Sequence, residues 1–471
     1  MTHIFRKKIL FTFVYLISIG ILFFIAYNLD PVYFSKALII GSSLILFAQV
    51  LLVKRINGKW LNPVIVFLLS FYLFQNGQLL LYSLGIKFND FYLQYAIKYI
   101  KEISIFTSVS NVLVGLAAIL TTKPALKYQQ KADSLSKYKR QEISRLGICG
   151  MLLASLVAIP LVVYKFTLVL RGGYYLVRSF ESTVPAVLTF IEYMFVPFSI
   201  LTLLYSSKKQ YLFAQLVFFV WSIVTALCGD RTTGIAGLFI ILYIGSLKTP
   251  SKHKIKKSIF AIIGFAFILV FIRFVFQFRS QNSFSSVSGG TVEIITDNIS
   301  EFGFSFFPLY MVMEIIPSKE PFFWGVGYLS AFVSGCLPSF LDPTGTIRSL
   351  ERIAHINGTW QDKYFSSFDF GFGYSLNAEA YSNFGWYGLF AVFLICIVIF
   401  FFLQRNNKKE KIDNFNIYEQ CVLLFVWLTL PRRDSYYIWK GLVYCVILIK
   451  VYLMVFTSKK LKTTNAKQIF C

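Results

Sequence analysis

The groups best suited to chemistry are concentrated in one polar stretch between Arg348 and Glu379. This stretch holds arginines, a histidine and several acids, which makes it the densest set of general acid and base candidates in the sequence. We expect the catalytic groups to include Glu379, His355 and Asp369. Glu379 stands among small and aromatic residues, where partial burial would hold it close to a substrate. The alternatives are that Glu379 caps a helix or pairs with an arginine, and that His355 is an ordinary surface residue.

A second group of candidates consists of arginines that stand apart from the lysine-rich segments. The planar guanidinium group binds phosphate oxygens through two parallel hydrogen bonds and keeps its charge when partly desolvated. These arginines therefore predict a phosphate or pyrophosphate site, although each could instead pair with an acid or reach the lipid headgroups. For Arg231, the adjacent Asp230 is the obvious local partner. The candidates are Arg171, Arg178, Arg231, Arg273, Arg279, Arg432 and Arg433.

The chain that must position these residues is too apolar for a soluble protein. Its residues are 56% hydrophobic and only 14% charged, and its mean hydropathy is +0.65. We predict an all-α polytopic integral membrane protein with about twelve transmembrane helices, because each apolar run is long enough to cross a hydrocarbon core of roughly 30 Å. The eighth and eleventh runs are short and more polar, so a re-entrant segment is the alternative for both. The runs are 9–27, 37–53, 61–84, 104–121, 146–164, 184–206, 211–228, 232–247, 258–276, 384–403, 416–430 and 436–456.

The distribution of basic residues predicts the orientation of these helices. More than half of the 46 lysines and arginines lie in alternate connections, and these connections account for the net charge of +24. Because basic connections stay on the cytoplasmic side, both termini are predicted to be cytoplasmic. The basic charge is thus a topology signal that also meets anionic lipid headgroups, which argues against nucleic-acid binding.

One connection is much longer than the others and lies on the opposite, extracytoplasmic side. It divides the chain into transmembrane helices 1–9 in residues 1–276, the long loop in residues 277–383, and helices 10–12 with a basic cytoplasmic tail in residues 384–471. The loop contains twice as many acids as bases. Its aromatic-rich apolar segments, 300–316 and 320–335, are predicted to be helices at the outer membrane interface, with two further membrane spans as the alternative.

Two motifs carry a resemblance to a known family. The segment GFGYSLNAEAYSNFGWYG, from Gly371 to Gly388, enters a late span, and GDRTTG follows an earlier one, with the long outer loop between them. This arrangement resembles the Wzy-type O-antigen and capsular repeat-unit polymerases. The resemblance implies a GT-C-like multi-span glycosyltransferase that is inverting, metal-independent and free of cofactors. It implies polyprenyl-pyrophosphate-linked glycans as both donor and acceptor.

The resemblance also suggests roles for particular residues. It implies that Arg231 in the GDR motif binds the lipid pyrophosphate, with Arg273 or Arg279 following by position, and it puts Glu379 in the acidic position of the terminal motif. The implied location is the bacterial cytoplasmic membrane. The implied partners are the lipid-linked donor and acceptor, membrane lipids, a chain-length regulator and a flippase, and they include no nucleic acid.

Two other functions fit parts of the same pattern. A lipid-linked glycan ligase would share the arginines, the long outer loop and the loop histidine, and would differ in its acceptor. A flippase or transporter without chemistry would usually have its longest connection midway between two repeats, whereas the long loop here is asymmetrically placed.

Overall fold

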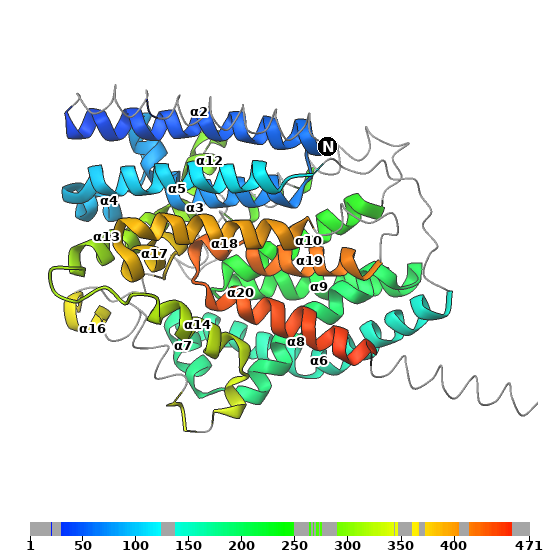
Figure 1. The fold of residues 1–471 in the computed structure, drawn as a ribbon. Coiled ribbons are helices and arrows are strands. Elements are labelled where there is room, and N and C mark those ends of the chain that lie inside the picture. The colour runs from blue at the N-terminus through cyan, green and yellow to red at the C-terminus, as the bar shows by residue number, and fades with distance from the viewer. Residues whose placement is uncertain are drawn as a thin grey trace, which may run out of the picture.

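The computed structural model describes residues 20, 30–123, 137–248, 263–264, 267, 270–272, 274–275, 290–342, 344–346, 360–366, 373–404 and 414–454. Throughout these ranges the regular elements are helices, and the described part contains no strand. Figure 1 shows the long helices running side by side in one bundle. The predicted all-α polytopic membrane protein is therefore confirmed.

The first half of the chain supplies most of the long helices. They are α2 (Pro31–Asn57), α3 (Pro63–Ser83), α4 (Phe91–Ala96), α5 (Ile100–Thr121), α6 (Lys137–Gly172), α7 (Tyr174–Thr183), α8 (Ala186–Tyr205), α9 (Lys208–Leu227) and α10 (Arg231–Lys248).

The second half contains shorter helices and the last long ones. They are α12 (Thr291–Phe302), η3 (Gly303–Ser305), α13 (Phe306–Ile315), α14 (Val326–Cys336), η4 (Ser339–Leu341), α16 (Gln361–Tyr364), α17 (Leu376–Phe384), α18 (Gly388–Leu403), α19 (Asn414–Trp427), η8 (Leu430–Arg432) and α20 (Tyr436–Lys440), which continues as a π-helical stretch over Gly441–Ile447.

Eight of the described helical segments are long and apolar enough to cross a membrane, and each overlaps one of the predicted spans. Two predicted spans, 232–247 and 416–430, correspond to α10 and α19, which do not belong to this set of eight. These are the two spans that looked weakest in the sequence. The predicted span 9–27, apart from Gly20, and most of 258–276 lie outside the described residues, so the number twelve stays a prediction.

Helix starts follow local capping chemistry. Helix α2 begins after Asp30, whose carboxylate accepts the Val32 N–H at 3.0 Å, and α3 begins after Asn62, which accepts the Val64 N–H at 3.0 Å. Each cap is followed by a proline, whose fixed φ suits the first helical position. Helix α17 starts in the same manner, since Ser375 Oγ accepts the Ala378 N–H at 3.1 Å.

Polar contacts join the segments predicted to be cytoplasmic at one end of the bundle. Asn57 donates to the Lys123 carbonyl at 3.3 Å, and the Lys123 N–H donates to Gln404 Oε1 at 3.1 Å. In Figure 1, α4, α13, α16 and α17 lie at the opposite end. Three of the segments predicted to be cytoplasmic therefore lie at one end of the bundle, and the side of the membrane that this end faces stays a prediction.

The apolar segments of the long loop are helical, as predicted, and the first of them is covered by other helices. Helix α13 is buried along almost its whole length, with Phe306, Met311 and Ile315 fully covered. It packs against α4, α5 and α17 because it has no polar face to turn toward headgroups. Helix α14 packs one side on α20 and leaves Leu329 exposed.

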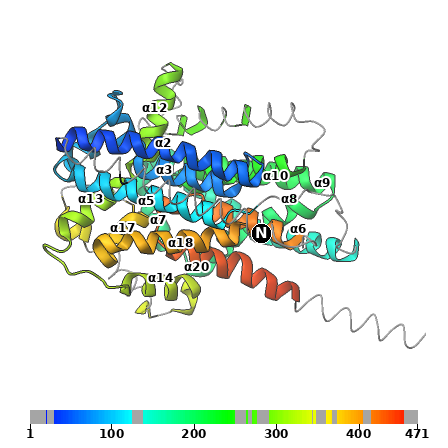
Figure 2. The same ribbon diagram turned by 45° about the horizontal axis from the view of Figure 1, so that its top comes forward.

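A close backbone contact fixes the start of the loop against the bundle. A Cβ atom added at Gly77 in α3 would lie 2.7 Å from both the Gly303 Cα and the Ile299 carbonyl oxygen. Figure 2 shows α12, which precedes Gly303, standing out from the bundle beside α2 and α3. Only glycine at position 77 permits this approach.

Gly77→Ala is therefore expected to destabilise the protein by about 1–3 kcal/mol, because backbone atoms cannot yield to the new methyl group. Thermal unfolding in detergent should show a lower midpoint than the wild type. Gly290→Ala is the matched control, since a Cβ atom there meets nothing within 4 Å. Equal midpoints for Gly77→Ala and the wild type would contradict the contact.

Candidate active site

A buried polar face of α3 positions the segment between α19 and α20. Gln75 Nε2 donates to the Pro431 carbonyl at 2.6 Å, and Gln75 Oε1 accepts from Asn377 Nδ2 at 3.1 Å. Asn377 also donates to Ser110 Oγ in α5 at 3.0 Å. Helices α3, α5 and α17 thus hold the Pro431–Arg432–Arg433 turn in place. The signal in the sequence was the polar run Gln75–Asn76–Gly77–Gln78 within an apolar span, which our sequence analysis did not use.

Glu379 lies in α17 and binds the same segment from the other side. Its side chain is only 3% exposed, and its two carboxylate oxygens accept the Ser435 N–H at 2.8 Å and the Ser435 hydroxyl at 2.6 Å. Ser435 thus donates one hydrogen bond to each carboxyl oxygen of Glu379. In this structure Glu379 therefore anchors the turn that leads into α20.

Three of the predicted arginines meet at this end of the bundle, and we call Arg231, Arg432 and Arg433 the arginine cluster. Arg231 begins α10, whereas Arg432 and Arg433 lie between α19 and α20. The guanidinium of Arg231 is 2.5 Å from Glu301 in α12, and both side chains are largely buried. Arg231 is thus paired across the bundle with a residue of the long loop.

Among the described residues, Arg432 is the member of the cluster that forms no ion pair with an acid. Its guanidinium lies over the Phe304 ring at 4.2 Å, and no ion pair joins it to an acid in the part of the chain that the structure describes. Burial, followed by the like charge of Arg231, lowers the pKa of Arg432 to about 10. Arg432 is still charged at neutral pH, and among the described residues its charge is opposed only by Glu301, which already pairs with Arg231.

Arg433 is held by several contacts on one side of its guanidinium. Its Nη2 donates to Thr232 Oγ1 at 3.1 Å and to Thr233 Oγ1 at 3.2 Å, and lies 3.6 Å from Asp230 Oδ1. The group also stacks on Tyr437 at 4.3 Å. Burial opposes its charge, yet Tyr437 and Asp230 raise the pKa of Arg433 above its ordinary value.

The prediction that Asp230 forms an ion pair with the adjacent Arg231 is wrong. Asp230 is the N-cap of α10, and its Oδ1 accepts the Thr233 N–H at 3.1 Å and the Thr232 hydroxyl at 3.0 Å. This cap turns the carboxylate toward Arg433, while Arg231, as the first residue of the helix, points to Glu301. Burial alone would raise the pKa of Asp230, but Arg433 and the threonine donors together lower it.

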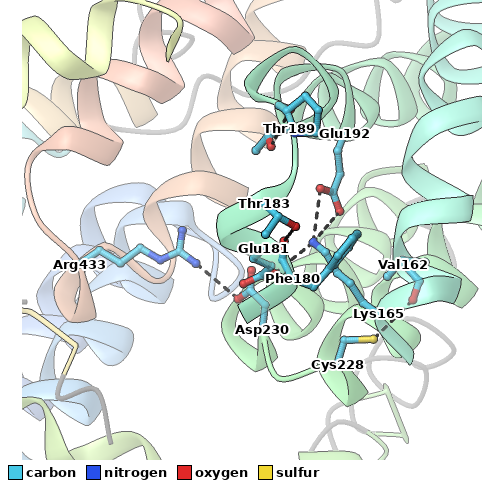
Figure 3. Close-up of polar contacts among 11 residues, drawn as sticks. Val162, Lys165, Phe180, Glu181, Thr183, Thr189, Glu192, Cys228, Asp230 and Arg433 are labelled. Carbon is cyan, nitrogen blue, oxygen red and sulfur yellow. Dashed lines mark hydrogen bonds and ion pairs between the residues drawn. The ribbon is translucent and has the colours of Figure 1, made fainter. Parts of the chain in front are cut away.

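A second ionic group lies next to Asp230. Lys165 in α6 binds Glu181 in α7 at 3.1 Å and Glu192 in α8 at 3.2 Å. Figure 3 shows Arg433, Asp230, Glu181, Lys165 and Glu192 together, with their side chains turned toward one another. The sequence analysis missed this group, although a lysine within an apolar span is a recognisable signal.

The other predicted site residues are not joined to the arginine cluster by a described contact. Arg171, at the end of α6, and Arg178, in α7, are exposed. Arg273, Arg279, His355 and Asp369 lie outside the described residues.

The helices and the site define a multi-pass membrane protein in which one buried and two half-buried arginines gather at one end of a helical bundle. The chain belongs to the family O-antigen polysaccharide polymerase Wzy, whose sequence model matches residues 8–464, nearly the whole chain. The resemblance found in the two motifs is thereby confirmed. Searches of curated proteins and of solved structures found no match.

Membership in this family defines the general activity. The protein is a glycosyltransferase-type polymerase of O-antigen polysaccharide biosynthesis. The prediction of a membrane protein of polysaccharide biosynthesis is confirmed as well.

Proposed function

We propose that the protein extends a glycan carried on polyprenyl pyrophosphate, at the outer face of the bacterial cytoplasmic membrane. A growing O-antigen or capsular chain is the donor, and an incoming lipid-linked repeat unit is the acceptor. A terminal hydroxyl of the acceptor attacks the anomeric carbon of the donor. The bond from that carbon to the pyrophosphate oxygen breaks, and the electron pair leaves with the polyprenyl pyrophosphate.

This displacement requires positive charge where the leaving group develops negative charge. The arginine cluster supplies this charge with side chains that are positioned before the substrate binds. An attack from the face opposite the pyrophosphate inverts the anomeric configuration. The guanidinium groups take the part that a metal ion has in other transferases, so we propose a metal-independent reaction.

The observation that carries the proposal is the state of Arg432. Arg432 is half-buried, and a partly desolvated cation without an acidic partner is costly, so proteins keep such a group where an anion compensates it. The described neighbours of Arg432 include the Phe304 ring, Tyr92, two like-charged arginines and Glu301, which already binds Arg231. A pyrophosphate would complete this site.

We assign Glu379 a positioning role, because its carboxylate binds Ser435 and so fixes the segment that carries Arg432 and Arg433. His355 and Asp369 stay proposed catalytic groups of the long loop. Arg273, Arg279, Arg171 and Arg178 stay proposed contacts for the pyrophosphates of donor and acceptor. A chain-length regulator and a flippase are proposed partners.

Deletion of the gene distinguishes the polymerase from its alternatives. Loss of a polymerase leaves surface glycan of a single repeat unit. Loss of a ligase leaves full-length polymer on the lipid carrier, and loss of a flippase leaves lipid-linked units on the inner leaflet. The last two outcomes would each refute the proposed function, and gel analysis of surface and lipid-linked glycan separates all three.

The proposed sidedness predicts that reporters fused at Ser285 and at Lys408 lie on opposite sides of the membrane. A phosphatase reporter, which is active only outside, should work at Ser285 and fail at Lys408. A cytoplasmic fluorescent reporter should give the reverse result. The same side for both positions would overturn the topology.

A further inference from the structure

Asp230 has the geometry of a carboxylate prepared to accept a proton. Its Oδ1 is fixed by the Thr233 N–H, the Thr232 hydroxyl and Arg433. Its Oδ2 has no hydrogen bond in the described part of the chain, and the side chain is 48% exposed. One oxygen is thus held rigidly, while the other can receive a substrate hydroxyl.

The ionisation of Asp230 suits the same role. A base must be deprotonated before the substrate arrives. Desolvation by the surrounding protein would raise the pKa of this half-exposed carboxyl, but Arg433 and the threonine donors outweigh it and lower the pKa of Asp230. Asp230 is therefore a carboxylate throughout the neutral pH range.

Arg433 connects Asp230 to the proposed pyrophosphate site. Its Nη2 faces Asp230 and the threonines, while Nη1 has no partner among the described residues. A phosphate oxygen bound at Nη1 would lie across the guanidinium from Asp230, because Asp230 Oδ1 is 3.6 Å from Nη2 on the other side. This separation leaves room for an anomeric carbon and an attacking hydroxyl between the carboxylate and the leaving group.

The neighbouring acids do not compete with Asp230 for this role. Glu181 and Glu192 both bind Lys165, which compensates part of the negative charge beside Asp230. Figure 3 shows the Lys165 group on the side of Asp230 that faces away from Arg433. Asp230 is therefore the carboxylate that lies between the arginine cluster and the Lys165 group.

We propose that Asp230 is the catalytic base that takes the proton from the attacking hydroxyl of the acceptor. This assignment rests on the proposed function of the arginine cluster. As the acceptor oxygen bonds to the anomeric carbon, its proton passes to Asp230 Oδ2. At the same time the bond to pyrophosphate breaks, and the departing charge is neutralised by the arginines.

Asp230→Asn tests the assignment, because asparagine caps helices about as well as aspartate but is not a base. The assay uses purified protein in vesicles with radiolabelled lipid-linked repeat units, extracted from the deletion strain. We expect kcat to fall by about 10²- to 10⁴-fold, with the KM for the lipid-linked substrate changed far less. Asp30→Asn is the matched control, since Asp30 is also an exposed N-cap aspartate.

Sodium azide then separates a catalytic from a structural role. Azide attacks carbon without losing a proton, and it enters more readily once the negative charge of Asp230 is gone. Asp230→Asn should therefore recover the release of polyprenyl pyrophosphate in azide, with a glycosyl azide as product. A raised KM without azide rescue, or wild-type turnover, would overturn the assignment.

Arg432→Ala, assayed in parallel, separates the assignment of Asp230 as the base from the proposed pyrophosphate site of the arginine cluster. If Arg432→Ala is inactive and Asp230→Asn is active, the pyrophosphate site stands and only the base is wrong. If Arg432→Ala polymerises normally, the proposed function of the cluster fails as well.

Discussion

Replacing Arg432 by alanine should abolish polymer formation without lowering the stability of the protein. Preorganised charges at a developing anion contribute about 10²- to 10³-fold each to turnover, and Arg432 is the cluster arginine with no acidic partner in the described structure. Its removal also relieves the cost of burying a cation. The thermal midpoint in detergent should therefore equal or exceed that of the wild type, while polymer disappears from gels.

The lysine variant and a distant arginine provide the controls for Arg432. Arg432→Lys should recover only part of the activity, because an ammonium group cannot bind two phosphate oxygens in a planar fork. Arg145→Ala removes an exposed arginine of α6 and should polymerise normally. Polymer of normal length from Arg432→Ala would show that the unpaired guanidinium has no part in the reaction.

Glu379→Gln should have the second-largest effect. The amide keeps one acceptor oxygen and puts an NH₂ group where the carboxylate accepts a second hydrogen bond from Ser435. A buried donor facing a donor costs about 1–3 kcal/mol, so the turn carrying Arg432 and Arg433 should shift. We expect turnover to fall at least tenfold, with a raised KM for the lipid-linked donor.

Glu379→Asp tests whether the carboxylate itself is needed. The Glu379→Asp variant keeps both acceptor oxygens. In the vesicle assay used for Glu379→Gln, its turnover and its KM should therefore lie between those of Glu379→Gln and those of the wild type. If aspartate were as inactive as glutamine at equal protein levels, packing rather than the hydrogen bonds to Ser435 would explain the effect. Wild-type kinetics for glutamine would remove Glu379 from the site.

The sequence predicted the membrane class and much of the arginine cluster for physical reasons. Apolar runs report the thickness of the bilayer, and alternating basic connections report the side of each helix end. Because Arg231, Arg432 and Arg433 lie at connections predicted to share one side, their gathering at one end of the bundle could be anticipated. The planar guanidinium group of arginine then indicated that the bound anion is a phosphate or pyrophosphate.

The pairings within the site could not be predicted in the same way. Arg231 binds Glu301 rather than the adjacent Asp230, because the start of α10 turns the aspartate back onto its own helix. The hydrogen bond from Gln75 to Pro431 joins residues that are far apart in the sequence. Such contacts depend on how helices pack, which periodicity and composition do not determine.

The first helices of the long loop are another feature that the sequence alone does not determine. Aromatic residues and the absence of a polar face on α13 fit either an interfacial helix or a buried one. Packing against α4, α5 and α17 decided for burial. A single sequence offers no signal for that choice.

The central claim is that this protein joins lipid-linked repeat units with release of polyprenyl pyrophosphate at the arginine cluster. The direct test incubates purified protein in vesicles with lipid-linked single repeat units and measures both polymer and free polyprenyl pyrophosphate. We predict one free carrier for each linkage formed with the wild type, and neither product with Arg432→Ala. Polymer without released carrier, or equal products from both proteins, would contradict the account.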